Sequence, residues 1–200
     1  MNEHVRPQRG TTQAAEGLPR LRWTIDDLDQ MVAAGVLTED DRVELIGGEL
    51  VPMSTKGPLH EAIKLALTRW LRKSLPDELD YLTELGWRPD KVTYCEPDVL
   101  IFPARTSPSK VPPADVFLAI EIADTSERYD LGTKASVYAG LGVREYWVLV
   151  ASSLTTIVHR EPGTRGYGAI REVPATETLA PSLLPGVTLC VADLEIVSEE

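Results

Sequence analysis

The chain has 200 residues, of which 43% are hydrophobic and 26% are charged, a composition that predicts one globular domain with a substantial core. No apolar run approaches the ~20 residues that span a bilayer, and the N-terminus lacks a hydrophobic signal region, so we expect a cytoplasmic protein without membrane contacts. The formal net charge of −11 argues against a general nucleic-acid binder, which usually carries a basic surface.

The first residues predict a tail and then a short helix. Residues 1–21 are polar, contain several Pro and Gly and show no periodicity, so we expect a disordered tail followed by a folded domain over 22–200. Thr24 is a typical N-cap residue, and the two acids that follow it favour the first turn of a helix that ends near Gly35.

Two short apolar runs, at 42–46 and 49–53, flank the dipeptide Gly47-Gly48, a pattern typical of a β-hairpin. In the first run Glu44 shares a strand face with Ile46, because side chains alternate between the two faces of a strand. Glu44 therefore either lines a cleft or lies exposed on an edge strand.

A strong helix is predicted over 58–74, where apolar residues recur at helical spacing until Pro76 ends the helix. The expected buried stripe consists of Leu59, Ile63, Ala66, Leu67 and Trp70. His60 is either a packing residue, the commoner role of a lone histidine, or a contact to substrate or water. The segment 56–73 holds five bases and one acid, so a local basic face can coexist with the acidic total.

Four strands are predicted next, at 81–85, 87–93, 99–102 and 116–123. The last two are short, rich in β-branched residues and bounded by turn-forming residues, as strands buried on both faces of a sheet are. Asp98 opens one of these runs and Glu121 lies inside the other. An unpaired buried carboxylate loses several kcal/mol, so each acid needs a cation, either a lysine or a bound metal ion.

The helix predicted from about Asp130 supplies such a cation. One stripe of this helix is apolar except for Lys134, which therefore points toward the sheet. The stripe contains Leu131, Lys134, Val137, Tyr138 and Leu141. Two inward acids and an inward lysine predict a functional site, although a buried salt bridge explains any one of them alone. Ser126, in the turn before this helix, either contacts substrate or water or caps the turn.

The remaining strands are predicted at 145–151, 154–160, 167–173 and 187–191. The order of elements indicates a single domain of the mixed α/β class with a central sheet. The two cysteines, Cys95 just after the predicted strand 87–93 and Cys190 within 187–191, lack CxxC spacing. This favours buried free thiols and leaves a disulfide between them open.

Several motifs occur in an order that identifies a family. They are Pro97-Asp98, Glu121 in an apolar strand, Asp130-Leu131-Gly132 with Lys134 and Tyr138, and Gly142-Val143-x-Glu145-Tyr146-Trp147. With Glu44 and His60 upstream, this pattern resembles the Uma-two family, a branch of the PD-(D/E)xK superfamily of nucleases. The resemblance runs from about Trp23 to the C-terminus. It implies a restriction-endonuclease-like fold, with a mixed central β-sheet flanked by helices.

The resemblance also implies a metal-dependent phosphodiesterase site. Asp98 and Glu121 would hold Mg²⁺ or Mn²⁺, Glu44 would match the upstream acid of the superfamily, and Lys134 would complete the catalytic set. The general pattern places the lysine two residues after the second acid, where this chain has Ala123, so the lysine has moved to the following helix. Zinc is disfavoured, because His and Cys are few and lack ligand spacing.

Two functions remain open at this point. The first is an endonuclease that hydrolyses DNA phosphodiester bonds, with His60 and Ser126 as substrate contacts. The alternative is a nuclease fold that serves as a non-catalytic binding or assembly module. The complete pair of acids favours the endonuclease, whereas the acidic net charge and the displaced lysine keep the alternative open. The resemblance also suggests a homodimer, because many enzymes of the superfamily use two sites to cut two strands.

Overall fold

A computed structural model of the whole chain describes residues 21–38, 40–84 and 86–197. The predicted disordered tail lies outside these residues except for Leu21. The strands are β1 (Val43–Ile46), β2 (Glu49–Pro52), β3 (Leu79–Leu82), β4 (Val99–Pro103), β5 (Leu118–Ala123), β6 (Glu145–Val150), β7 (Thr156–Gly163), β8 (Gly166–Val173), β9 (Thr178–Leu179) and β10 (Leu189–Cys190). The α-helices are α1 (Ile25–Ala33), α2 (Pro58–Ser74), α3 (Glu127–Tyr129) and α4 (Ala135–Leu141).

Shorter helical segments complete the secondary structure. A π-helical turn, η3 (Asp130–Lys134), joins α3 to α4, so the three form one crossover helix. Single 3-10 turns are η1 (Pro108–Lys110), η2 (Pro113–Asp115) and η4 (Val191–Asp193). Within the described residues, we find no helix with the length and apolar character needed to cross a membrane.

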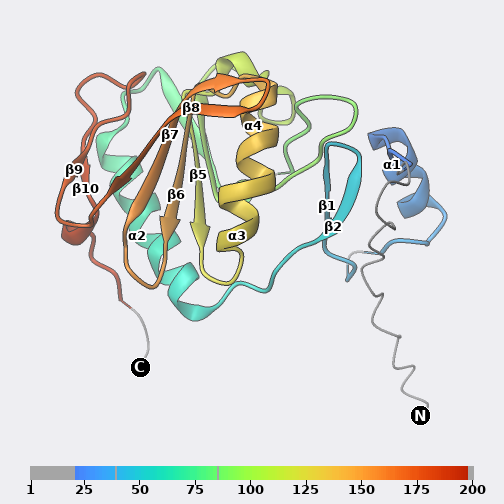
Figure 1. Cartoon of the computed structure of the whole chain (residues 1–200), viewed down its shortest axis with the longest axis horizontal. Coiled ribbons are helices and arrows are strands. Elements are labelled where there is room, and N and C mark those ends of the chain that lie inside the picture. Colours follow the sequence, from blue (N-terminus) through green and yellow to red (C-terminus); the bar gives the residue numbers. More distant parts are fainter. Residues whose placement is uncertain (1–20, 39, 85, 198–200) are drawn as a thin grey trace, which may run out of the picture.

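The centre of the molecule is a six-stranded sheet with the strand order β3-β4-β5-β6-β7-β8 (Figure 1). Its neighbouring strands run antiparallel except for β5 and β6, which are parallel. A parallel pair needs a crossover connection, and the crossover helix provides it. The predicted α/β class with a mixed central sheet is therefore confirmed.

Side chains alternate along the central strands and so build two cores. Val99 and Ile101 of β4 pack with α2 residues such as Leu67 on one face of the sheet. Leu100, between them, packs with Tyr138 of α4 on the other face. Figure 1 shows α4 in front of the sheet and α2 behind it. Burial on both faces explains why these strands carry nearly continuous apolar runs.

The strand register brings the two predicted acids to the same face. β4 and β5 are antiparallel and pair Val99 with Ile120. One position further in this register, Asp98 stands opposite Glu121. Ile120 packs on the α2 side, and Glu121, which alternates with it, faces the crossover helix. The acids therefore stand next to each other at one end of the β4–β5 pair.

Helix α1 and the β1–β2 hairpin form a smaller layer beside the sheet (Figure 1). A capping box at Thr24 starts α1, and the hairpin predicted from the sequence is present. Its turn at Gly47 and Gly48 has φ of 59° and 90°, a left-handed conformation that glycine adopts without a steric penalty. Leu45 packs against α1, so Glu44, the preceding residue, points to the other face of β1.

The strand predicted over 87–93 is wrong. In its place the chain bends over 90–92, and Trp87 forms an isolated bridge with Cys95. Pro89 supplies no backbone N–H for a strand ladder, which favours the bend. The predicted strand 81–85 is also shorter and begins earlier, as β3. Both cysteines are free thiols, with Cys95 buried.

The crossover helix begins earlier than predicted, at Glu127 instead of near Asp130. A π turn joins the two α-helical parts of this crossover. Asp130 is buried together with Lys134, which follows it at the four-residue spacing of one helix face, whereas Leu131 of the predicted stripe is only half-buried.

Glu145 links β6 to the C-terminal segment. Its buried carboxylate accepts hydrogen bonds from Trp147 Nε1 and Arg160 Nη2, both at 2.8 Å, and from Ser182 N at 2.7 Å. Glu145→Ala would leave these donors without their acceptor. We therefore expect the free energy of unfolding, measured by urea denaturation, to fall by about 2 kcal/mol.

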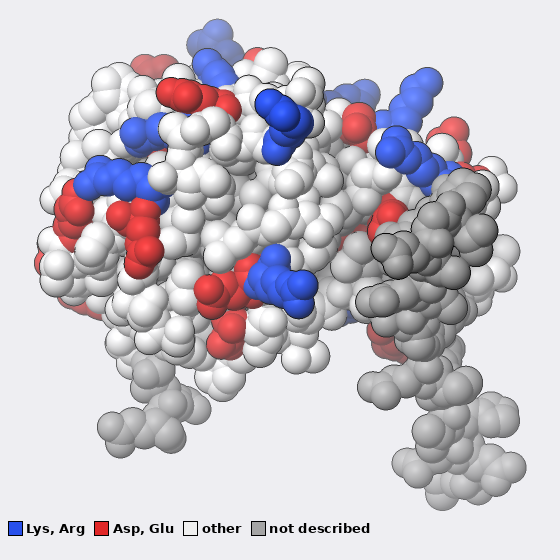
Figure 2. Space-filling view, viewed as in Figure 1, with Lys and Arg blue, Asp and Glu red and all other residues white. Residues whose placement is uncertain are grey.

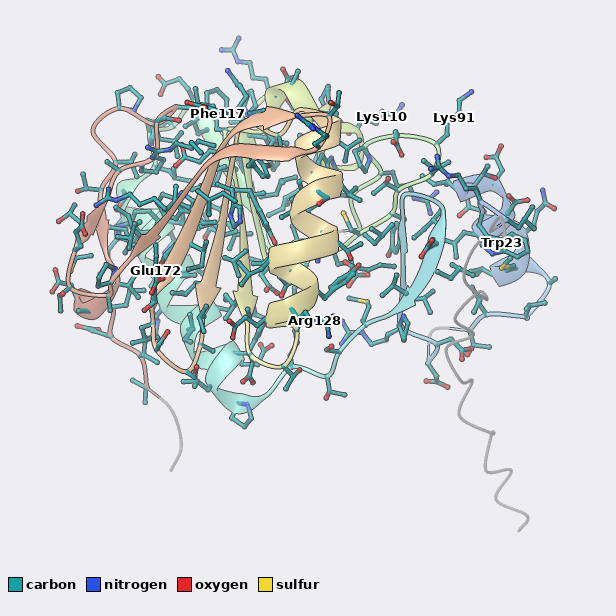
Figure 3. All side chains as sticks on the ribbon, in the orientation of Figure 1. Trp23, Lys91, Lys110, Phe117, Arg128 and Glu172 are labelled. Atoms are coloured by element: carbon teal, nitrogen blue, oxygen red, sulfur yellow. The ribbon has the colours of Figure 1, made fainter. Side chains whose placement is uncertain are left out.

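Glu172→Ala is the matched control for this prediction, because Glu172 is an exposed acid of β8 (Figure 3). Its substitution should change the free energy of unfolding by less than about 0.5 kcal/mol. Equal losses in the two variants would contradict a structural role for the Glu145 carboxylate.

Candidate active site

A buried lysine joins two carboxylates beside the sheet. Lys134 Nζ lies 2.8 Å from Glu121 Oε1 and 3.1 Å from Glu44 Oε1, and each of the three side chains is 5% exposed. Tyr138 donates a hydrogen bond from its hydroxyl to Glu121 Oε1 at 3.1 Å. The cluster therefore connects β1, β5 and the crossover helix. Of the two alternatives for Glu44, the exposed edge-strand position is wrong.

Asp98 lies directly before β4, and both of its carboxylate oxygens have partners. Oδ2 accepts a hydrogen bond from the backbone N of Ile122 at 2.8 Å and lies 3.0 Å from His60 Nε2. Oδ1 accepts from Lys56 Nζ at 2.7 Å. The first turn of α2 supplies His60, and the loop before that helix supplies Lys56. Two segments beside the sheet thus hold one carboxylate.

A cavity of about 510 Å³ connects the two groups of residues. All the residues predicted for the site line this cavity, namely Glu44, His60, Asp98, Glu121, Ser126 and Lys134. Lys56, Arg128 and Asp130 line it as well. The predicted site residues are thus brought together by the fold around one hollow that opens to solvent.

Ser126 and Asp130 form a second pair in this cavity. Ser126 occupies the N-cap position of α3, but its side chain does not cap the helix. Its hydroxyl instead donates to Asp130 Oδ2 at 2.5 Å. Burial raises the pKa of Asp130 to about 6, although the charge of Lys134 and the hydrogen bond from Ser126 oppose the shift. Asp130 is thus poised to change its charge near neutral pH.

Asp98 and Glu121 have opposite pKa shifts although they are neighbours. Burial favours the neutral acid at Asp98, but the hydrogen bonds and charges of His60 and Lys56 outweigh it and hold the pKa well below its usual range. Burial raises the pKa of Glu121; Lys134 opposes this shift, whereas the negative charge of Asp98 adds to it. Adjacent acids with pKa values pushed apart are typical of functional sites.

Lys134 remains protonated at neutral pH. Burial alone would lower its pKa, but the carboxylates of Glu121 and Glu44 outweigh that effect and raise the pKa well above its usual value. Glu44 is itself held in place, because its carboxylate accepts from the backbone N of Glu96 at 3.0 Å and from the Tyr129 hydroxyl at 3.2 Å. The lysine is therefore a fixed positive charge at the wall of the cavity.

The oxygen ligands of this site fit a hard divalent cation. Asp98 and Glu121 stand side by side, and Mg²⁺ is usually bound through one or two carboxylates while it keeps several waters. No three His, Cys, Asp or Glu residues of the described chain form a ready-made ligand group. Carboxylate oxygens are hard donors of the kind that Mg²⁺ and Mn²⁺ prefer, and they differ from the tetrahedral N and S environment that zinc prefers.

Sequence reasoning missed Lys56, Arg128 and Asp130. Asp130 carried a usable signal, because residues four apart lie on the same face of a helix and Lys134 follows it at that spacing. Lys56 and Arg128 carried none, since one lies in an irregular loop and the other is exposed in the first turn of a short helix.

The fold and the site together define a nuclease-like α/β protein. The chain resembles a crystal structure described as "a putative nuclease belonging to DUF820" from Anabaena variabilis, with a TM-score of 0.65 and 16% sequence identity. The similarity covers 85% of this chain and 96% of that one. At this identity the likeness shows the fold. A search among curated proteins finds no match.

The sequence profile of the Uma2 family, described as "Putative restriction endonuclease", matches residues 25–192. The chain belongs to this family, the Uma-two family that its motifs resemble. The match includes β1, the whole central sheet and the crossover helix, so it spans every segment that lines the cavity. Family membership supports a nuclease function.

Lys134→Met should destabilise the protein, because Glu44 and Glu121 would keep buried negative charge without a cation. We expect a loss of about 3 kcal/mol in the free energy of unfolding at neutral pH. Without Lys134 the pKa of Glu121 rises further, so the folded state binds more protons than the unfolded state above about pH 4.5. The stability of the variant should therefore fall as pH rises from about 5 to about 8.

Urea denaturation at these two pH values measures the effect. Lys91→Met is the control, because Lys91 is an exposed lysine far from the cavity lining (Figure 3). A Lys134→Met deficit that is equal at both pH values would contradict the assignment of Lys134 as the counter-ion of a buried carboxylate.

Proposed function

We propose that this protein is a metal-dependent endonuclease that hydrolyses DNA phosphodiester bonds. The observation that carries the proposal is that Asp98, Glu121 and Lys134, from three separate segments, meet at one open cavity of about 510 Å³. The chemistry needs an activated water and stabilisation of negative charge on phosphoryl oxygens. Two carboxylates that can hold a cation, beside a fixed ammonium group, meet both needs.

Asp98 and Glu121 would hold Mg²⁺ or Mn²⁺, which when bound acidifies water and draws charge from phosphoryl oxygens. The lowered pKa of Asp98 favours its ionised form at neutral pH, and the raised pKa of Glu121 would return toward its usual value when a further positive charge arrives. Hydrogen bonds from Ile122 N and His60 fix the orientation of Asp98 before any ligand binds. Preorganisation of this kind limits the entropy lost on binding.

Lys134 would stabilise negative charge in the transition state. Its raised pKa makes it a poor proton acceptor, so a role as general base is disfavoured. Glu44 positions the lysine through the 3.1 Å contact and does so from β1, a strand outside the central sheet. In the general pattern of the superfamily, the lysine follows the second acid by two residues. In this chain Lys134, on the crossover helix, contacts that acid, Glu121.

His60 and Ser126 were expected to contact substrate, and this expectation remains a prediction. His60 is 3% exposed and directs Nε2 at Asp98, which supports a positioning role for that ring. Ser126 is bonded to Asp130, so it would reach substrate only after that hydrogen bond breaks. Arg128, exposed on α3 at the cavity, is the side chain best placed to bind a phosphate (Figure 3).

One observation favours the alternative of a non-catalytic binding module. Asp98 is already neutralised by Lys56, so the site is internally paired as it stands. The expected basic face is also reduced, because Lys56 and Lys64 of the segment 56–73 contact Glu84. Figure 2 shows acidic and basic side chains interspersed on the face in view. A binding module would keep DNA affinity after the loss of Asp98 and show no metal dependence.

The homodimer, the cytoplasmic location and the preference for DNA over RNA are further parts of this proposal. A homodimer, which would place two sites on two strands, is tested by sedimentation of the full chain with and without a DNA duplex. The cytoplasmic location and the preference for DNA over RNA are likewise predictions, and parallel assays on labelled DNA and RNA test the second.

Asp98→Asn and Glu121→Gln should each reduce Mg²⁺- or Mn²⁺-dependent nicking of plasmid DNA by at least about 100-fold, because each removes an anionic ligand. Gel assays with metal and with a chelator measure the effect, and circular dichroism checks that the variants fold. Glu172→Gln is the control acid and should cleave normally. Undiminished cleavage by folded Asp98→Asn protein would refute the proposed site.

Arg128→Ala should weaken DNA binding without removing the metal site, because Arg128 contributes charge at the cavity, whereas Asp98 and Glu121 form ion pairs with Lys56 and Lys134. Loss of one phosphate contact should lower the slope of log affinity against log salt by about 1. Fluorescence anisotropy over a range of salt concentrations measures this slope. A slope identical to that of the wild type would exclude Arg128 from the phosphate contacts.

A further inference from the structure

Lys56 occupies an unusual position between two carboxylates. It lies in the irregular loop between β2 and α2, and its side chain is 16% exposed. Its Nζ lies 2.7 Å from Asp98 Oδ1 and 2.5 Å from Glu84 Oε1. Lys56 also lines the cavity that contains Glu121 and Lys134. A cation thus already sits on the carboxylate that the proposed function assigns to a metal ion.

The two oxygens of Asp98 are held in different ways. Oδ2 is bonded to a backbone N–H, that of Ile122, and to the ring of His60, which is buried at the first turn of α2. The backbone N–H belongs to β5 and cannot leave without moving the strand, and the His60 ring is 3% exposed. Oδ1 is bonded to Lys56, whose flexible four-carbon side chain can change rotamer. Oδ1 is therefore the oxygen that can exchange its partner.

Glu84 is the second carboxylate partner of Lys56. Its backbone has φ of 53°, a left-handed conformation that is uncommon outside glycine, and its N donates to Pro97 O at 3.0 Å. This geometry directs the Glu84 carboxylate to Lys56 and also to Lys64, at 2.9 Å. Lys56 can therefore release Asp98 and still keep one carboxylate partner.

We propose that Lys56 is an exchangeable counter-ion of the active site. While no divalent cation is bound, its ammonium group neutralises Asp98 at Oδ1. When a cation takes that oxygen, Lys56 keeps its contact with Glu84 and turns its remaining N–H donors to the cavity, where they bind a phosphate of the nucleic acid. This inference rests on the proposed function, and it adds a regulation of that site, namely that metal binding creates the phosphate contact.

The first test measures metal affinity by calorimetric titration of Mn²⁺ into the wild type, Lys56→Met and Lys64→Met. Lys64 is the matched control, because it also contacts Glu84 and has a side-chain exposure of 13%, but it does not contact Asp98. Both substitutions remove one positive charge, so a general electrostatic effect would act on both. We expect Lys56→Met to bind Mn²⁺ about tenfold more tightly than Lys64→Met, because it alone removes the competitor.

The outcomes of this titration distinguish a failure of the counter-ion proposal from a failure of the proposed metal site. Equal Mn²⁺ affinity in Lys56→Met and Lys64→Met, with binding retained, would overturn the counter-ion proposal and leave the proposed metal site standing. Absence of Mn²⁺ binding in all three proteins would overturn both. Binding in Lys56→Met alone would support the counter-ion proposal, because it would show that the lysine excludes the metal completely.

The second test asks whether the phosphate contact depends on metal. Fluorescence anisotropy measures binding of a short DNA duplex to the wild type and to Lys56→Met, in Ca²⁺, which is used to avoid cleavage, and in a chelator. We expect Lys56→Met to bind DNA about fivefold more weakly in Ca²⁺ and with unchanged affinity in the chelator. A loss of equal size in both conditions, or no loss in either, would overturn the proposal.

Discussion

The contact of Lys134 with Glu44 and Glu121 is the interaction on which the arrangement of the site depends. A buried ammonium group and two buried carboxylates would each be costly alone, and they are tolerated because Lys134 Nζ lies 3.1 Å from the Glu44 carboxylate and 2.8 Å from that of Glu121. The contact fixes the hairpin and the crossover helix against β5. It thereby helps to set the shape of the cavity, because all three of these charged residues line it.

The residues that line the cavity carry more negative than positive charge. Glu44, Asp98, Glu121 and Asp130 are buried acids, and Lys56 and Lys134 are the cations that contact three of them. Burial and mutual repulsion raise the pKa values of Glu121 and Asp130. A site of this kind gains stability when it takes up another positive charge, which is what a metal-dependent phosphodiesterase needs before an anionic substrate can approach.

A chain with a negative net charge could bind a nucleic acid through contacts that are concentrated at the cavity. Long-range attraction of DNA is weak for a protein with a formal net charge of −11. Local contacts at the cavity would therefore supply most of the affinity, from Arg128 at its edge, from a bound cation and from any lysine that the cation releases. Binding would then depend more steeply on metal than it does for a protein with a broad basic surface.

The sequence by itself determined most of the elements and the inward direction of the key charges, but it predicted a strand over 87–93 where the chain bends. The periodicity over 58–74, the Gly47-Gly48 turn and the apolar runs around Asp98 and Glu121 are local patterns, and the high cost of an unpaired buried charge makes these acids conspicuous. Only the tertiary structure decided which cation meets which acid. Lys56 reaches Asp98, and Lys134 reaches Glu121 and Glu44, because strand register, a π turn and an irregular loop set these distances, and such long-range geometry leaves no periodic signal in the chain.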